Sequence, residues 1–196
     1  MKINVSKFSE TDIISKVAFI NDRRINSNIH FNLPGSVSDT LRWYNNIGTS
    51  KDRIDFVFKN DEDVTVGMCG LINIDLQHSS TEFYILINPD LHGRGLGKLL
   101  TAWTTNYAFL TYNLNKIYLY TDSDNAKALN LYKKLGFVQE GCQRQHRYKD
   151  GVFKDKIAFG LLRTEWLFED WRKSLIEFSF GLPGDLIDVE IFSLLS

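Results

Sequence analysis

Three glycines lie within five residues, at Gly93, Gly95 and Gly97, between an aliphatic segment and a long amphipathic one. Glycine allows backbone amides to approach a ligand closely, and the start of a helix carries unpaired N–H groups and a partial positive charge. Arg94 and Lys98 add side-chain charge at the same place. This arrangement suits a pyrophosphate, although glycine spacing alone is equally compatible with a turn that binds no ligand.

Two familiar phosphate-binding loops do not match this stretch. A Walker loop requires Ser or Thr directly after its lysine, whereas Leu99 follows Lys98. A dinucleotide-binding fingerprint requires a wider glycine spacing and an acidic residue about twenty residues later, and residues 111–116 contain none. A different phosphate-binding motif is therefore needed to explain the three glycines.

The run from His92 to Gly97 resembles the coenzyme A motif of the GNAT superfamily of N-acetyltransferases, Gln/Arg-x-x-Gly-x-Gly/Ala. It follows a predicted strand that ends at Asn88-Pro89, as is common in that family. His92 stands where the family favours Gln or Arg. Because such a loop acts largely through main-chain amides, we expect this difference to alter affinity rather than abolish binding. The cofactor-binding residues that the resemblance implies are Ile85, Leu86 and Ile87 for the pantetheine arm, and His92, Gly93, Arg94, Gly95, Leu96, Gly97 and Lys98 for the pyrophosphate.

Asn125 stands seven residues before Tyr132 in a predicted helix, so both side chains lie on roughly the same face, about two turns apart. A helical tyrosine taken alone is most simply a packing residue. The block from residue 124 to 137, however, resembles the second GNAT signature. The resemblance implies that Tyr132 protonates the departing coenzyme A thiolate and that Asn125 contacts the cofactor. With a thiol pKa of ~8.5 and a phenol pKa of ~10, complete proton transfer in water costs only about 2 kcal/mol.

Glu82 is the candidate general base. It opens the strand that leads to the glycine loop, and Glu82-Phe83 resembles a pair found there in the ribosomal-protein and polyamine acetyltransferase branches of the family. An ion pair with a neighbouring Lys or Arg explains Glu82 equally well. We expect a neutral amine to attack the thioester directly in a ternary complex, with the oxyanion stabilised by a main-chain N–H of the strand ending at Ile87.

The expected activity is transfer of an acetyl group from acetyl-CoA, a co-substrate used without a metal, to a primary amine of a small molecule. The N-terminus of a protein is the alternative acceptor. A coenzyme A-binding module without catalysis is a further alternative, against which the intact Tyr132 argues.

The pattern of apolar residues predicts an α/β fold of the α+β type: a twisted, mostly antiparallel sheet of about seven strands flanked by helices, as in the GNAT fold, with an extra C-terminal helix. Strands are expected at residues 2–8, 53–59, 64–74, 81–87, 116–121, 137–148 and 152–161, and helices at 9–26, 38–47, 94–112 and 124–135.

The bulk composition fits one globular domain: 196 residues, 43% hydrophobic, with a net charge of −1. The near-neutral charge argues against nucleic acid or an anionic membrane as a partner. The polar start and the lack of an apolar run near ~20 residues favour a cytoplasmic protein. Cys69 and Cys142 are predicted to be reduced and buried.

Residues 23–38 occupy the region where GNAT proteins usually build acceptor specificity. They contain no acidic residue, which weakens a polyamine assignment. The basic run at 143–147 is compatible with an acceptor that bears a phosphate or carboxylate, or with a solvated surface. We assign residues 1–165 to the acetyltransferase domain and 166–196 to a helical extension. Its apolar tail at 186–195 packs either on the same domain or at the interface of a homodimer.

Overall fold

The computed structural model describes residues 2–29, 34–47, 50–167 and 186–188. The strands are β1 (Lys2–Lys7), β2 (Ile54–Asn60), β3 (Thr65–Asp75), β4 (Ser80–Ile87), β5 (Lys116–Asp122), β6 (Val138–Lys149), β7 (Val152–Leu162) and β8 (Leu186–Asp188). The α-helices are α1 (Ile13–Asn21), α2 (Arg23–Asn26), α3 (Val37–Ile47), α4 (Leu96–Asn106), α5 (Ala126–Lys134) and α6 (Arg163–Leu167). Short 3-10 turns cover Glu10–Asp12 and Pro89–Leu91, and a π-helical turn, Tyr107–Thr111, continues α4.

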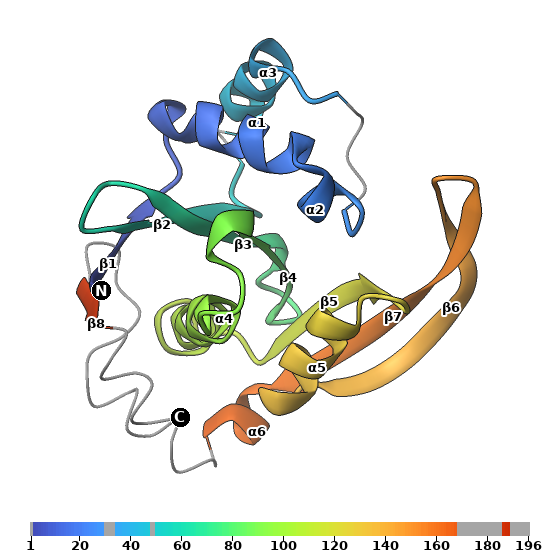
Figure 1. Cartoon of the computed structure of the whole chain (residues 1–196). Helices are drawn as coiled ribbons and strands as arrows, with labels where there is room; N and C mark the ends of the chain where they lie inside the picture. Colours follow the sequence, from blue (N-terminus) through green and yellow to red (C-terminus); the bar gives the residue numbers. More distant parts are fainter. Residues whose placement is uncertain (1, 30–33, 48–49, 168–185, 189–196) are drawn as a thin grey trace.

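The strands form one mixed sheet in the order β6-β7-β5-β4-β3-β2-β1-β8. Its neighbours are antiparallel except for β4 and β5, which are parallel and are joined by the crossover through α4. Helices α1, α2 and α3 cover one face of the β2–β4 half, α4 covers the opposite face of that half, and α5 lies alongside β5 and β7 (Figure 1). The predicted fold class and the mostly antiparallel sheet of about seven strands are confirmed.

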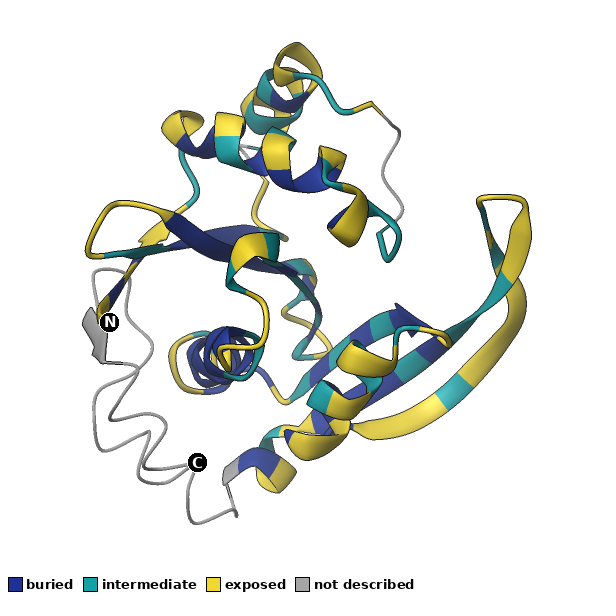
Figure 2. Ribbon diagram, in the orientation of Figure 1, coloured by how far each residue is buried: buried dark blue, intermediate teal, exposed yellow. Residues whose placement is uncertain are grey.

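Two apolar cores lie on the two faces of the sheet. The larger one packs α4 and α5 against the strands and contains Trp103, Phe56 and Phe159, each 1% exposed or less. The smaller one lies under α1 and contains Phe19, Ile20 and Leu86. Figure 2 shows α4 as a deeply buried helix, whereas β6 is exposed along most of its length. Burial of the apolar stripe of α4 is thus the main source of packing free energy around the glycine loop.

The predicted helix at 9–26 is wrong in one respect, because the chain breaks it at Asp22. That residue adopts an extended backbone conformation (φ −71°, ψ 125°), and its side chain accepts a hydrogen bond from the Arg24 N–H, which caps α2. Aspartate favours such N-cap positions because its carboxylate satisfies an orphan N–H. The break turns the chain toward the glycine loop.

The C-terminal residues add an eighth strand that the sequence did not predict. Residues 186–188 pair antiparallel with β1, with Ile187 opposite Ile3. Helix α6 overlaps the first residues of the predicted C-terminal helix, and the rest of that prediction falls on residues 168–185, outside the described part of the chain. Part of the apolar tail therefore packs on its own sheet.

Candidate active site

Strands β4 and β5 pair only at their beginnings. The paired positions are Ser80, Thr81 and Glu82 on β4 with Lys116, Ile117 and Tyr118 on β5. Beyond this point β5 pairs only with β7, its partner along its whole length, while residues 83–87 of β4 pair with β3. The two halves of the sheet diverge from here (Figure 1). We call this divergence the fork. It leaves one edge of β4 open for an extended ligand.

Only alternate residues of β4 turn their main-chain groups toward the open edge. The Asn88 N–H donates to the Val66 carbonyl beyond the end of β3, at 3.0 Å. Because successive residues of a strand turn their main-chain groups to opposite sides, Leu86 also faces β3, and Ile85 and Ile87 face the fork. The sequence grouped Leu86 with these two residues. Its side chain instead lies in the small core under α1.

The glycine loop lies directly after β4. Gly93 and Gly95 have φ values of +83° and +76°, and a Cβ added at either position would meet no atom within 4 Å. Only glycine adopts this backbone conformation without strain, and the space above both residues is open. These observations fit a ligand that approaches the main chain closely.

Helix α4 begins at Leu96, two residues later than predicted, because the left-handed Gly95 is its N-cap. The first intrahelical bonds run from the Lys98 and Leu99 N–H groups to the Gly95 carbonyl, at 3.0 and 3.2 Å. The preceding N–H groups of Leu96 and Gly97 are therefore the free donors of the first turn. Gly97 has a second role, since an added Cβ there would lie 3.2 Å from the Leu131 side chain of α5.

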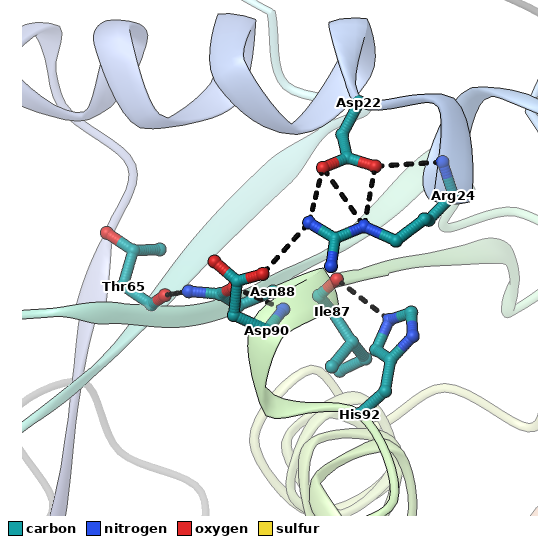
Figure 3. Close-up of polar contacts among 7 residues, drawn as sticks. All are labelled: Asp22, Arg24, Thr65, Ile87, Asn88, Asp90 and His92. Atoms are coloured by element: carbon teal, nitrogen blue, oxygen red, sulfur yellow. Dashed lines mark hydrogen bonds and ion pairs between the residues drawn. The ribbon is translucent and has the colours of Figure 1, made fainter.

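The charged side chains of the loop differ in their surroundings. Arg94 is exposed, and Lys98 is half-buried. Burial lowers the pKa of Lys98, and the nearby Lys134 lowers it further. His92 is exposed, and its Nε2 atom lies 3.3 Å from the Ile87 carbonyl oxygen (Figure 3). The loop thus brings two cations and a histidine to the end of the open edge of β4.

Two interactions fix the turn between β4 and the loop. The Asn88 side chain donates to the Thr65 carbonyl at 2.9 Å and accepts from the Asp90 N–H at 3.0 Å. Arg24 forms an ion pair with Asp90 at 2.9 Å and a second with Asp22 at 2.7 Å (Figure 3). The hydrogen bonds from Arg24 lower the pKa of Asp22 to about 2.

The Arg24 bridge was not predicted from the sequence, which treated residues 23–38 only as an acceptor region. It connects the α1–α2 junction on one face of the sheet to the glycine loop at the end of β4. The signal in the sequence that could have revealed this junction is Asn21-Asp22, because both residue types favour N-cap positions. The partnership with Asp90, 66 positions away, has no local signal.

Tyr132 extends from α5 into the large core and is 6% exposed. Its ring contacts Phe137 and Phe159, with centroids 5.7 and 6.0 Å away. Burial raises its pKa, and the Cys69 thiol adds to the rise. Cys69 lies on β3 opposite Ile85, and Phe159 lies on β7 opposite Leu119 of β5. Tyr132 is therefore near residues from both sides of the fork, and it holds its proton at neutral pH.

Asn125 is the N-cap of α5. Its Oδ1 atom accepts a hydrogen bond from the Ala128 N–H at 3.2 Å, and its own main-chain N–H donates to the Asp122 carbonyl. The side chain therefore has a structural task, which is to begin the helix that carries Tyr132. A contact with the cofactor remains a prediction.

Glu82 lies at the point where the fork opens, on the face of the sheet opposite Tyr132. Its Oε2 atom accepts a hydrogen bond from the Asn73 side-chain amide at 3.1 Å. Tyr118 is its in-register partner on β5, and Glu82 contributes to the raised pKa of Tyr118 after the larger effect of burial. The expected alternative, an ion pair with a neighbouring Lys or Arg, is not seen among the described residues.

The β6–β7 hairpin closes one side of this face. The Lys149 ammonium at its tip donates to the Ile29 carbonyl after α2, at 2.6 Å. The basic run on β6 is partly used internally, since Arg147 pairs with the buried Asp122 at 2.8 Å. His30, which follows Ile29, lies outside the described residues.

Two further expectations concern the cysteines and membranes. Cys69 and Cys142 are both free thiols, as predicted, but Cys142 is exposed on the edge strand β6 rather than buried. None of the helices in the described ranges is long and apolar enough to cross a membrane.

Comparison with known proteins assigns the family. A family model described as the acetyltransferase (GNAT) domain matches residues 2–138. This chain belongs to the GNAT family. Spermidine N(1)-acetyltransferase of Vibrio cholerae is 34% identical over 112 residues, which cover 57% of this chain and 65% of that protein. The Escherichia coli enzyme is 33% identical over 103 residues, covering 53% and 55%. The matched segments thus span less than two thirds of either relative.

Solved structures of the family give the same fold over nearly the whole described chain. The crystal structure of spermidine N-acetyltransferase from Vibrio cholerae in complex with CoA and spermine has a TM-score of 0.80 and 29% identity, covering 84% of this chain and 98% of that one. A putative ribosomal N-acetyltransferase of Bacillus subtilis is 28% identical over 100 residues, 51% of this chain and 55% of that protein. The resemblance to the GNAT family and to its spermidine and ribosomal branches is confirmed.

Proposed function

We propose that this GNAT chain transfers the acetyl group of acetyl-CoA to a primary amine of a small molecule by direct attack in a ternary complex. The fork carries the proposal. An open β-edge ends in a glycine loop and a helix start, and a buried tyrosine lies on one face and a carboxylate on the other. The relatives that act on spermidine support a small-molecule amine as the acceptor.

In the proposed complex the main chain of Ile85 and Ile87 pairs with the pantetheine arm as an added strand would. The N–H groups of residues 93–97 hold the pyrophosphate, because that short stretch combines left-handed glycines with the first turn of α4. Arg94 and Lys98 supply charge beside it. The acetyl carbonyl then lies near the Ile85 N–H, which stabilises the oxyanion.

Proton transfers complete the reaction. The amine nitrogen forms a bond to the acetyl carbon, and the carbon–sulfur bond breaks. Glu82 takes the proton that the attacking amine releases, directly or through water. Tyr132 gives its proton to the departing thiolate, and the raised pKa of its phenol keeps that proton in place until the thiolate forms. The products are an N-acetylamine and coenzyme A.

The test is release of the coenzyme A thiol with a panel of amines: spermidine, a short diamine, an amino sugar, amino acids and a peptide with a free N-terminus. We expect turnover with at least one small amine. In Glu82→Gln the rate of this turnover should fall about 100-fold. Turnover with the peptide alone would make the chain a protein N-terminal acetyltransferase. Tight coenzyme A binding without turnover of any amine would make it a binding module and end the proposal.

The domain assignment, the cellular location and the oligomeric state are further parts of this proposal. We assign residues 1–165 to the acetyltransferase domain and 166–196 to an extension packed on it. The pairing of β8 with β1 supports this packing, as does the hydrogen bond of 2.7 Å from Trp166 to Asn106. A cytoplasmic location and a homodimer are also proposed, and light scattering during gel filtration tests the dimer.

A further inference from the structure

The face of the sheet that carries Glu82 also carries Lys156, a cation that forms no ion pair with any described residue. Tyr118 and Tyr120 alternate along β5, so both rings lie on this face, with centroids 5.9 Å apart. Tyr118 is opposite Glu82 on β4, and Tyr120 is opposite Ala158 on β7. Lys156 lies two residues before Ala158 and reaches back over the Tyr120 ring, with its ammonium 3.7 Å from the ring centroid. A carboxylate and an ammonium therefore flank the same pair of tyrosines.

The buried Asp122 is opposite Lys156 in the β5–β7 register but pairs with Arg147, and the Lys156 ammonium lies over the Tyr120 ring. Among the described residues, no carboxylate lies within ion-pair distance of it. Lys154, two residues before it on β7, and Lys116, at the other end of β5, in contrast pair with Asp124 and Glu140 respectively, each at 2.7 Å. The tyrosine ring fixes the side chain by a cation–π interaction. A fixed cation that no acid neutralises is ready to receive an anion.

The surrounding charges give this face a polarity. Burial lowers the pKa of Lys156, nearby Arg147 lowers it further, and Glu82 acts in the opposite direction. Arg147 is neutralised by Asp122, which is fully buried. The net charge is thus negative at Glu82 and positive at Lys156.

The adjoining space is small. A hollow of about 290 Å³ lies beside the two tyrosines and is lined also by Ser80, Ala158 and the Lys116–Glu140 ion pair. Neither Glu82 nor Lys156 lines this hollow, which adjoins the two tyrosines on the side of Lys116. A diamine bound with one ammonium at Glu82 would bring its second ammonium toward Lys156, and the two like charges would repel each other.

We propose that Lys156 is a specificity-determining residue that binds a carboxylate of the acceptor, so that the preferred amine is a zwitterion of the amino-acid type rather than a polyamine. This inference rests on the proposed acetyl transfer. Glu82 receives the amine end of the acceptor, and Lys156 receives its carboxylate. The wall between them is formed by Tyr118 and Tyr120.

Two substrate pairs that differ only in the carboxylate test the proposal: free lysine against cadaverine, and ornithine against putrescine. In the wild-type protein we expect kcat/KM to favour the amino acid of each pair by about tenfold or more. Lys156→Met should reduce this preference about tenfold, mainly through KM. Lys156→Arg should retain it, and Lys156→Glu should reverse it. Lys154→Met, which removes a neighbouring lysine with its own partner, is the control and should leave the preference unchanged.

The outcomes separate the two proposals. A wild-type preference for the diamines, or an unchanged preference in Lys156→Met, overturns the role of Lys156 and leaves acetyl transfer intact. Absence of turnover with every amine removes both. Calorimetry of lysine and cadaverine on the protein loaded with coenzyme A provides a second readout. The wild-type protein, Lys156→Arg and the control Lys154→Met should bind the amino acid more tightly, whereas Lys156→Met and Lys156→Glu should not.

Discussion

The two faces of the sheet are built from different materials. On the face covered by α4 and α5, a large apolar core surrounds Tyr132, and the proposed cofactor contacts are main-chain groups beside it. On the other face, charged side chains occupy interior positions. Lys16 is 5% exposed, and Arg53 and Asp55 form a two-point ion pair, with hydrogen bonds of 2.6 and 2.8 Å. Glu82 and Lys156 lie further along this face.

This difference matches the two proposed substrates. Coenzyme A presents a pantetheine arm with amide groups and a diphosphate. The main chain of a β-edge can bind the first, and the N–H groups at a helix start can bind the second. An acceptor amine is recognised by its charges, so that side needs placed side chains from several elements. In the proposed reaction, the first face binds acetyl-CoA and the second selects the acceptor.

The largest expected effect is on the apolar face. Tyr132→Phe removes the proton donor and leaves the ring packing, so we expect kcat to fall about 1000-fold with little change in the Kd of acetyl-CoA. Tyr107→Phe is the control, because Tyr107 is 5% exposed in the same core but lies at the end of α4. Equal activity of Tyr132→Phe and wild type, measured by thiol release, would remove Tyr132 from the mechanism.

The glycine loop gives the next effect. Gly95→Asp places a carboxylate beside the proposed diphosphate, and we expect acetyl-CoA to bind about 100-fold more weakly by calorimetry. Gly151→Asp is a matched control: its φ is +83° and its surroundings are equally open, but it lies in the β6–β7 turn. If both variants bind acetyl-CoA as the wild type does, the loop is not the diphosphate site.

The charged face should make the stability of the protein depend on pH. Burial lowers the pKa of Lys16 to about 7, with Asp55 raising it and Arg53 lowering it, and its ammonium lies 3.4 Å from the centroid of Trp43. Since the unfolded value is near 10.4, the unfolded chain binds more protons between pH 7 and 10. This group therefore makes the protein more stable as pH rises through that window.

Lys16→Met removes this dependence. Its Tm relative to wild type should be higher at pH 6.5 than at pH 9.5 by about 3 to 6 °C, as scanning calorimetry can measure. Lys51→Met, at an exposed lysine, is the control. A Tm difference that is the same at both pH values would show that Lys16 stays charged throughout.

The smallest effect is expected where the two faces meet. Arg24→Gln breaks the bridge from α2 to the glycine loop, so the KM for acetyl-CoA should rise a few-fold because the loop is held less firmly. Its ion pairs are exposed, and the Tm should hardly change. Arg42→Gln removes another exposed pair, with Asp39, and should leave the KM unaltered. If Arg24→Gln and the control have the same KM for acetyl-CoA, the Arg24 bridge does not hold the glycine loop in place.

Much of the apolar face could be predicted from the sequence. The three glycines, the stripe of α4 and the position of Tyr132 are local patterns, and local patterns fix secondary structure and main-chain conformation. The same reasoning missed the break at Asp22 because the helical spacing continues through it. It also extended α4 backward to Arg94, since it did not foresee that Gly95 would take the N-cap position in a left-handed conformation.

The sequence by itself determined the family fold, the glycine loop and the tyrosine on α5, because each is written in a contiguous run of residues. Only the tertiary structure decided that Leu86 faces away from the fork and that Arg24 reaches Asp90. It also decided that Lys156 lies on the same face as Glu82, with two tyrosines between them. These relations depend on strand register and on which side of the sheet a residue faces. Pairing between distant strands sets both, so no local stretch of sequence contains them.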